Sequence, residues 1–163
     1  MDITLVGQTL AGRYRIDAFI GRGGMADVYK VWGQQRAVFL ALKVLHADLA
    51  KDKVFLRRFK REAQTLAKLQ HPNIVRFDSL EQDGSLVFML MDYVEGTSLR
   101  KEIFEAKDPL SIARVLEIVR SVCSVLQYAH SQGFLYSHLK PANILIDQSG
   151  RVMLSDLGVF QTS

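Results

Sequence analysis

The sequence predicts an α+β fold, with a β-rich part first and a helical part after it. Three strand-like segments, interrupted by glycines, precede residue 46. Apolar residues at helical spacing then predict a helix at residues 52–70 and a longer helix at residues 111–132. At 163 residues, with 48% apolar and 23% charged residues, the chain has the size and composition of a folded globular domain.

Charge and hydropathy bear on partners and location. The net charge is +4, and the basic residues are spread along the chain without interleaved aromatics. We therefore expect a mildly basic surface and no nucleic-acid partner. No segment approaches the roughly 18 apolar residues of a membrane span, and the first residues lack the basic and apolar regions of a signal peptide. The cytoplasm is the compartment that these features favour.

The β-rich part contains a glycine-rich segment. Strand-like segments at residues 13–20, 21–32 and 37–45 form the pattern of a β-meander, and residues 21–26 read GRGGMA. Glycine lets a backbone turn sharply and approach a ligand, which makes N–H groups available to phosphate oxygens. A purely structural hairpin turn explains the same residues equally well, so the segment alone leaves both interpretations open.

The helix predicted at residues 52–70 carries a carboxylate on its apolar face. That face is formed by Phe55, Phe59, Leu66 and Leu69, and Glu62 falls on it. Lys43 is the charged residue in the apolar segment VFLALKVL. Burying either charge alone costs several kcal/mol. The sequence therefore predicts a Lys43–Glu62 ion pair; the alternative is that each side chain reaches solvent separately.

A second hairpin is predicted after this helix. The residues His71, Pro72 and Asn73 break the helix, and strands at 74–80 and 86–91 flank a turn at 82–85. We expect His71 to be a loop or packing residue, because no second metal-binding side chain stands at ligand spacing from it.

The long helix at residues 111–132 has a clear start and end. Ser111 is the predicted N-cap and Gly133 the stop signal. Its single cysteine, Cys123, has no intrachain disulfide partner and is expected to be a buried thiol. Apolar residues cover most of the circumference: Ile112, Val115, Leu116, Ile118, Val119, Val122, Cys123, Val125, Leu126 and Tyr128. Such a helix needs neighbours on several sides, and we expect a protein partner to cover its exposed face.

The densest group of chemically active side chains follows this helix. It contains His138, Lys140, Asn143 and Asp156. Strands at 144–146 and 152–154 predict a hairpin that brings Asn143 and Asp156 side by side. An amide and a carboxylate suit a hard cation such as Mg²⁺. The sequence therefore indicates a site for a metal-bound phosphate.

These residues resemble the protein kinase superfamily, and in particular its bacterial serine/threonine members. The segment LKPANIL is similar to the family's catalytic loop, and Asp156-Leu157-Gly158 is similar to its metal-binding triplet. IGRGGMADVYK is similar to its glycine-rich loop, and MDYVEG is similar to the hinge between its lobes. The resemblance implies a complete N-lobe at about 12–92, a hinge at 93–96 and the first part of a C-lobe at 97–163.

The resemblance also implies ATP and Mg²⁺ as cofactors and assigns roles to residues. Lys43 would reach the α- and β-phosphates with Glu62 as its partner, Lys140 would contact the γ-phosphate, and Asn143 and Asp156 would bind the metal. Residues that would surround the nucleotide are Ile20, Gly21, Gly23, Gly24, Ala26, Val28, Ala41, Met91, Asp92, Val94 and Leu145.

The chain departs from the family where the substrate hydroxyl is oriented. Tyr136, Ser137 and His138 stand in the positions of the family's His-Arg-Asp, so a histidine replaces the catalytic aspartate. Neutral imidazole accepts a proton near pH 7, but a neighbouring γ-phosphate favours its protonated form, which cannot accept one. We therefore expect an ATP-binding module with impaired catalysis. An active kinase whose missing part is supplied in trans, and an interaction domain without nucleotide, are the alternatives.

Overall fold

The structure, a computed structural model, describes residues 5–155 and 159–161. The chain forms two compact units. The first contains the described residues up to Ala67 together with Phe77–Tyr93, and the second contains Lys68–Arg76 and the described residues from Val94 onward. The lobe boundaries inferred from the family, at residues 92 and 97, stay predictions.

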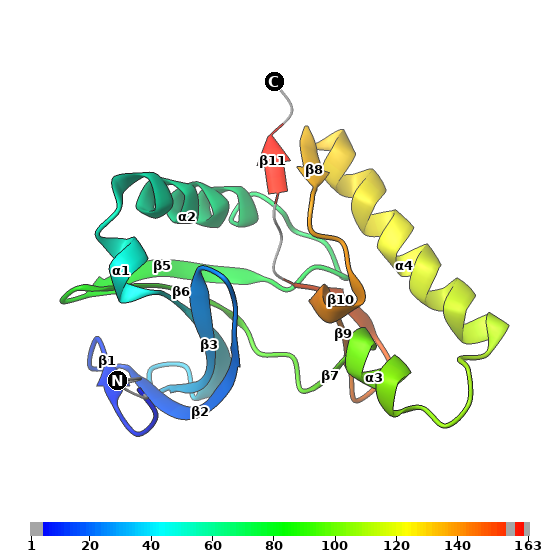
Figure 1. The fold of residues 1–163 in the computed structure, drawn as a ribbon, viewed down its shortest axis with the longest axis horizontal. Helices are drawn as coiled ribbons and strands as arrows, with labels where there is room; N and C mark the ends of the chain where they lie inside the picture. The colour runs from blue at the N-terminus through cyan, green and yellow to red at the C-terminus, as the bar shows by residue number, and fades with distance from the viewer. Residues whose placement is uncertain (1–4, 156–158, 162–163) are drawn as a thin grey trace. The chain divides into compact units, whose positions relative to one another are not determined.

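The first unit is built on a six-stranded antiparallel sheet with two helices (Figure 1). Its strand order is β1-β2-β3-β4-β6-β5. The strands are β1 (Thr9–Leu10), β2 (Tyr14–Arg22), β3 (Ala26–Gly33), β4 (Val38–Leu45), β5 (Phe77–Asp83) and β6 (Leu86–Asp92). The helices α1 (Ala47–Ala50) and α2 (Lys53–Leu66) follow β4, and α2 contacts β5. The predicted β-meander is confirmed.

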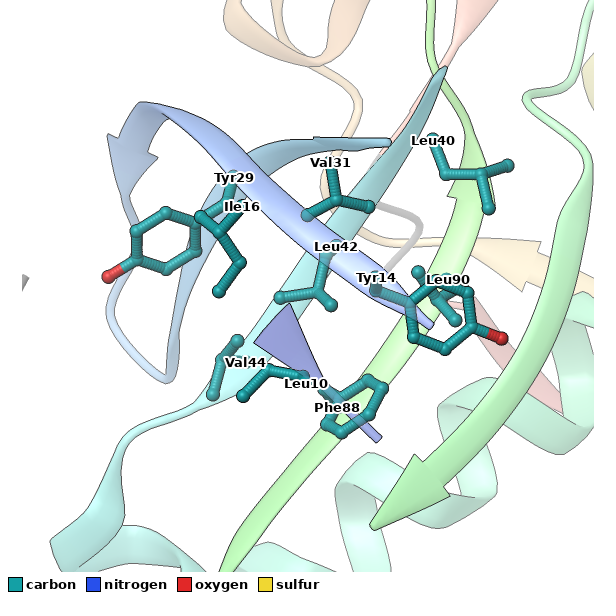
Figure 2. Packing of buried hydrophobic residues seen from close by; sticks show 10 residues of the cluster. All are labelled: Leu10, Tyr14, Ile16, Tyr29, Val31, Leu40, Leu42, Val44, Phe88 and Leu90. Atoms are coloured by element: carbon teal, nitrogen blue, oxygen red, sulfur yellow. The ribbon is translucent and has the colours of Figure 1, made fainter. Parts of the chain in front are cut away.

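One face of this sheet is a closed apolar core. Alternate residues of β3, β4 and β6 point into it, as strand geometry requires. Leu42, Phe88 and Leu90 have no exposed surface. Figure 2 shows how the cluster packs together: Leu10, Tyr14, Ile16, Tyr29, Val31, Leu40, Leu42, Val44, Phe88 and Leu90. The remaining alternate residues therefore lie on the opposite face.

The helix predicted at residues 52–70 is shorter than expected. Asp52 caps it by accepting a hydrogen bond from the Val54 N–H, but α2 ends at Leu66, four residues before Gln70. Pro72 disfavours a helical conformation for the residue before it. The backbone from Lys68 onward instead belongs to the second unit, where the Gln70 N–H donates to the Tyr128 hydroxyl at 3.0 Å.

The strand predicted to start at Ile74 also begins later. Ile74 forms an isolated parallel bridge with Leu154 of the second unit, and β5 starts at Phe77. The Val75 N–H donates to the Leu154 carbonyl at 2.9 Å. These bonds occupy the backbone groups that a longer β5 would have used. The predicted β5–β6 hairpin itself is confirmed, with Gly84 at φ +57° in its turn.

The second unit combines helices with short strands (Figure 1). Its helices are α3 (Leu99–Glu105), α4 (Ile112–Ser131) and the 3₁₀ turn η1 (Pro141–Asn143). Its strands are β7 (Gly96–Ser98), β8 (Phe134–Tyr136), β9 (Ile144–Asp147), β10 (Val152–Leu154) and β11 (Val159–Gln161). They pair in the order β10-β9-β7 and, separately, β11-β8. The predicted β9–β10 hairpin is confirmed.

The ends of α4 agree with the sequence. The Ser111 hydroxyl accepts a hydrogen bond from the Arg114 N–H, and Gly133 adopts φ +78° just after the helix. The buried face contains Ile118, Val122, Val125 and Ala129.

Cys123 does not lie on that face. It is exposed, so the expectation of a buried thiol is wrong. Adjacent helical residues are separated by about 100° around the axis, and Cys123 directly follows the buried Val122. Apolar composition alone did not distinguish the buried side of α4 from its exposed side.

Candidate functional site

Sheet register places the expected nucleotide-binding residues of the first unit on one face. Val28 pairs with Lys43, and Ala41 pairs with Met91. Directly paired residues in an antiparallel sheet point to the same side, and residues two apart on one strand do so as well. All four therefore lie on the face opposite the apolar core. Ile20 lies at a register shift between Phe19 and Gly21 and is 50% exposed.

An ion pair connects this face to α2. Lys43 Nζ donates to Glu62 Oε1 at 3.1 Å, and the two side chains are 11% and 15% exposed. The predicted Lys43–Glu62 ion pair is thus confirmed, and the alternative, in which each side chain reaches solvent separately, is wrong. Each charge compensates the other where neither is well hydrated. The pair also holds the lysine ammonium at a defined place on the sheet.

The glycine-rich segment forms the turn between β2 and β3. The strands pair as far as Arg22 and Asp27, and the Gly23 N–H donates to the Ala26 carbonyl at 2.8 Å. Gly24 lies in the intervening turn, and a Cβ added there would meet no atom within 4 Å. The segment is therefore a hairpin turn with at least one open backbone position, a geometry that suits an approaching anion.

A contact that sequence analysis missed lies beside this turn. Asp27 Oδ1 lies 3.1 Å from His46 Nε2 and accepts a bond from Arg22 Nε at 2.9 Å. The backbone N–H of His46 donates to the Met25 backbone carbonyl at 2.9 Å. The β3–β4 register, in which Asp27 pairs with Val44, is the signal that would have placed Asp27 near the end of β4.

The second unit carries the segment that resembles a catalytic loop. It runs from the end of β8 through His138 and Lys140, both exposed, into η1. Asn143 closes this loop, because its Nδ2 donates to the His138 carbonyl at 2.8 Å. The amide oxygen of Asn143 is then the side-chain atom suited to a cation.

The predicted approach of Asn143 to Asp156 is only partly visible. Ile144 pairs with Leu154 in the β9–β10 hairpin, and the Ser155 N–H donates to the Asn143 carbonyl at 3.0 Å. The next residue, Asp156, lies outside the described residues. Within the part of the chain that the structure describes, no three His, Cys, Asp or Glu side chains are grouped to hold a metal ion. Asn143 fits the metal-binding role by its chemistry.

Tyr136 is partly buried in the second unit, and its hydroxyl is shielded from solvent. Burial raises the pKa of its hydroxyl, and among the described residues that hydroxyl has no hydrogen-bond partner. A phenol held in this way stays protonated and acts as a packing group. Leu145, the remaining expected nucleotide contact on β9, is partly buried and pairs with Met153 and Ser98.

Asp92 and Val94 are the last two residues expected to contact the nucleotide. Asp92 pairs with Leu40 at the end of β6, and Val94 is the first residue of the second unit's main part.

Across residues 5–155 and 159–161, none of the helices has both the length and the apolar character to cross a membrane.

Known proteins show the same sequence pattern. The chain matches the family described as "Protein kinase domain" over residues 14–162. It is 39% identical over 155 residues to the serine/threonine-protein kinase PrkC of Bacillus subtilis, covering 95% of this chain and 24% of PrkC. It is 37% identical over 154 residues to the serine/threonine-protein kinase PknB of Mycobacterium tuberculosis, covering 92% of this chain and 24% of PknB.

Solved structures share the fold. Two crystal structures of the Mycobacterium tuberculosis PknI kinase domain superpose with a TM-score of 0.79, at 34% and 33% identity. They cover 94% and 95% of this chain, which in turn covers 61% and 63% of theirs. The chain thus spans about a quarter of the length of these curated relatives and about three fifths of the solved kinase domains. On the family match, the identities and the fold, the chain belongs to the protein kinase family, as a member of its bacterial serine/threonine type.

Proposed function

We propose that this chain binds ATP together with Mg²⁺ and acts as a nucleotide-binding or regulatory module with impaired phosphotransfer. The observation that carries the proposal is the Lys43–Glu62 ion pair, because it holds a cation on the sheet face that also presents Val28, Ala41 and Met91. Apolar side chains next to a fixed ammonium suit a flat base joined to phosphates. The kinase family generally uses ATP and Mg²⁺.

Each residue has a distinct part in this binding. Lys43 contributes positive charge to the α- and β-phosphates, and Glu62 holds the lysine in place. The open glycine-rich turn at Gly23 and Gly24 offers backbone N–H groups to phosphate oxygens. For the second unit, the resemblance to kinases assigns Mg²⁺ to Asn143, whose amide oxygen suits this cation, and the γ-phosphate to Lys140. When bound, Mg²⁺ neutralises phosphate charge.

The proposed impairment rests on His138. A carboxylate in this position accepts a hydrogen bond from a substrate hydroxyl, whereas an imidazole is bulkier and loses its acceptor when protonated. Phosphoryl transfer depends mostly on positioning and charge stabilisation, so slow ATP hydrolysis or self-phosphorylation is compatible with this substitution. The named serine/threonine kinase relatives favour the alternative of an active kinase, in which the rest of the domain completes the substrate site.

Substituting His138→Asp separates these two functions. We expect the wild type to transfer little γ-phosphate from labelled ATP to itself or to a generic protein substrate. The variant should transfer roughly 10²-fold more, the lower end of what a positioned general base contributes. His138→Asn is the matched control, because it shortens the side chain without restoring a carboxylate. Efficient transfer by the wild type would overturn the proposed impairment, and equal rates in all three proteins would show that residue 138 is not limiting.

We also propose a protein partner for the exposed face of α4. Ile112 is 80% exposed, and Val115, Leu116 and Val119 are 42%, 48% and 48% exposed. Their spacing of three or four residues forms a continuous apolar stripe. The solved kinase domains contain a further part with no counterpart in this chain, which covers 61% of one of them. A polypeptide equivalent to that further part is the occupant we propose, whether it lies in the same polypeptide or in another.

Co-expression tests this interaction. The further part of the PknI kinase domain, tagged, should copurify with this chain. Val119→Asp should abolish copurification, because burying an unpaired carboxylate in an apolar contact costs several kcal/mol. Glu117→Gln, on the same helix and 64% exposed, is the control that should leave it unchanged. Copurification that is absent, or that survives Val119→Asp, would exclude this face as the contact.

A further inference from the structure

The tip of the β2–β3 hairpin is attached to the end of β4 by a small set of contacts. The turn residues Gly23 to Met25 follow the last paired residues of β2, and Asp27 lies at the start of β3. His46 directly follows β4 and precedes α1. Its backbone N–H donates to the Met25 carbonyl at 2.9 Å, and the Nε2 atom of its imidazole lies 3.1 Å from Asp27 Oδ1. One residue thus contacts both the turn and the strand that leaves it.

Asp27 is the centre of this arrangement. Arg22 donates to both of its carboxylate oxygens, Nε to Oδ1 at 2.9 Å and Nη2 to Oδ2 at 3.2 Å. The Arg22 guanidinium, and secondarily His46, hold the pKa of this carboxyl below its ordinary value. The Asp27 side chain is 14% exposed and that of His46 is 24% exposed. The Asp27–His46 contact is therefore mostly shielded from water. A hydrogen bond in such surroundings is stronger than one at a fully exposed surface.

Glycine explains why such an attachment matters. Gly23 and Gly24 have access to more backbone conformations than other residues, so an unattached turn would lose more entropy when it orders around phosphate. Contacts that hold the turn in one conformation before the ligand arrives reduce that cost. The backbone bond from His46 to Met25 requires no particular side chain, whereas the contact with Asp27 requires a side chain at position 46 that reaches this carboxylate and can donate a hydrogen bond to it.

We infer that His46 is a positioning residue that holds the glycine-rich turn, through Asp27 and Met25, in the conformation that receives the phosphates of ATP. The inference rests on the proposed ATP binding, which it deepens by assigning a role to a residue outside the family's recognised motifs. His46 does not itself touch the nucleotide in this account. Its effect should therefore depend on the phosphates and not on the base.

Nucleotide affinity tests the inference. His46→Ala should weaken binding of Mg²⁺-ATP roughly three- to tenfold, which corresponds to the ordering of one or two side-chain or loop contacts. The affinity for adenosine, which has no phosphates, should stay unchanged, whereas a general structural defect would weaken both. His46→Gln should recover most of the ATP affinity, because its side-chain amide can donate to Asp27 from a similar distance along the chain.

A control ion pair lies on the neighbouring strand β2. Asp17 accepts hydrogen bonds from Arg15 on β2, at 2.7 Å from Arg15 Nε, in a pair away from the turn. Asp17→Asn should leave both affinities unchanged. If His46→Ala alters ATP and adenosine binding equally, or neither, the positioning role is overturned while ATP binding by the wild type still stands.

Hydrogen exchange in the absence of nucleotide provides an independent test. Amides of Gly23, Gly24 and Met25 should exchange severalfold faster in His46→Ala than in the wild type, and no faster in Asp17→Asn. Unchanged exchange would overturn the attachment itself. Because this measurement uses no ligand, it judges the role of His46 separately from the proposed function: a wild type that fails to bind ATP would overturn only the latter.

Discussion

Replacing Lys43 with methionine is expected to weaken Mg²⁺-ATP binding by roughly ten- to a hundredfold, measured by equilibrium titration. Hydrogen bonds between charged partners contribute about 1.5–3 kcal/mol each, and methionine keeps the apolar length of lysine without its charge. The substitution also leaves Glu62, only 15% exposed, without the ammonium that lies 3.1 Å away. We therefore expect a loss of about 1–3 kcal/mol in the free energy of unfolding.

A second substitution separates the two effects. The double variant Lys43→Met, Glu62→Leu removes both charges, and replacing an ion pair with apolar groups of similar size is often neutral for stability. Its free energy of unfolding should return close to that of the wild type, whereas its ATP affinity should stay low. Wild-type ATP affinity in Lys43→Met would contradict the proposed role of this lysine.

Substituting Gly96→Ala is expected to destabilise the second unit strongly. A Cβ built on Gly96 would lie 1.9 Å from the Ile146 carbonyl oxygen and 2.8 Å from the Asp147 Cα. Both are backbone atoms of β9, with which β7 pairs, so neither can move without breaking the ladder. Overpacking of this kind costs about 1–3 kcal/mol or more. Chemical unfolding should show that loss, and the melting midpoint should fall by several degrees.

Gly24→Ala is the matched control for this effect. No atom lies within 4 Å of the Cβ it would add. Its free energy of unfolding should stay within about 0.5 kcal/mol of the wild type, as for most exposed substitutions. A Gly96→Ala variant as stable as Gly24→Ala would show that β7 and β9 do not approach each other as closely as the structure describes.

Local patterns in the sequence were sufficient for much of the fold. Capping residues marked the ends of α4, because Ser111 and Gly133 act through backbone groups next to them. The Lys43–Glu62 pair was predictable because two isolated charges in apolar segments have few alternatives to pairing. The resemblance to the kinase family, and not a local pattern, grouped Val28 and Ala41 with Lys43, and the β3–β4 register of the structure puts all three on one face.

Features that depend on contacts between distant segments were not predictable in this way. The apolar period of the helix at 52–70 continues to Leu69, yet the chain leaves the helix after Leu66 and follows backbone bonds to the second unit. The position of Cys123 depends on which side of α4 its neighbours cover. The contact between Asp27 and His46 joins two polar residues of ordinary type, and no local pattern distinguishes them from solvated side chains.

The central claim, that this chain binds ATP with Mg²⁺, is tested most directly by a thermal-shift titration of the purified protein with ATP, with and without Mg²⁺. A ligand that binds only the folded state adds about 2.7 kcal/mol at one hundred times its dissociation constant, which should raise the melting midpoint by several degrees. We expect this rise with Mg²⁺, a smaller one without it, and in Lys43→Met a reduced one that corresponds to about 0.4–1.4 kcal/mol at the same ATP concentration. A cooperative melt whose midpoint does not respond to ATP under either condition would contradict the claim and favour an interaction domain that binds no nucleotide.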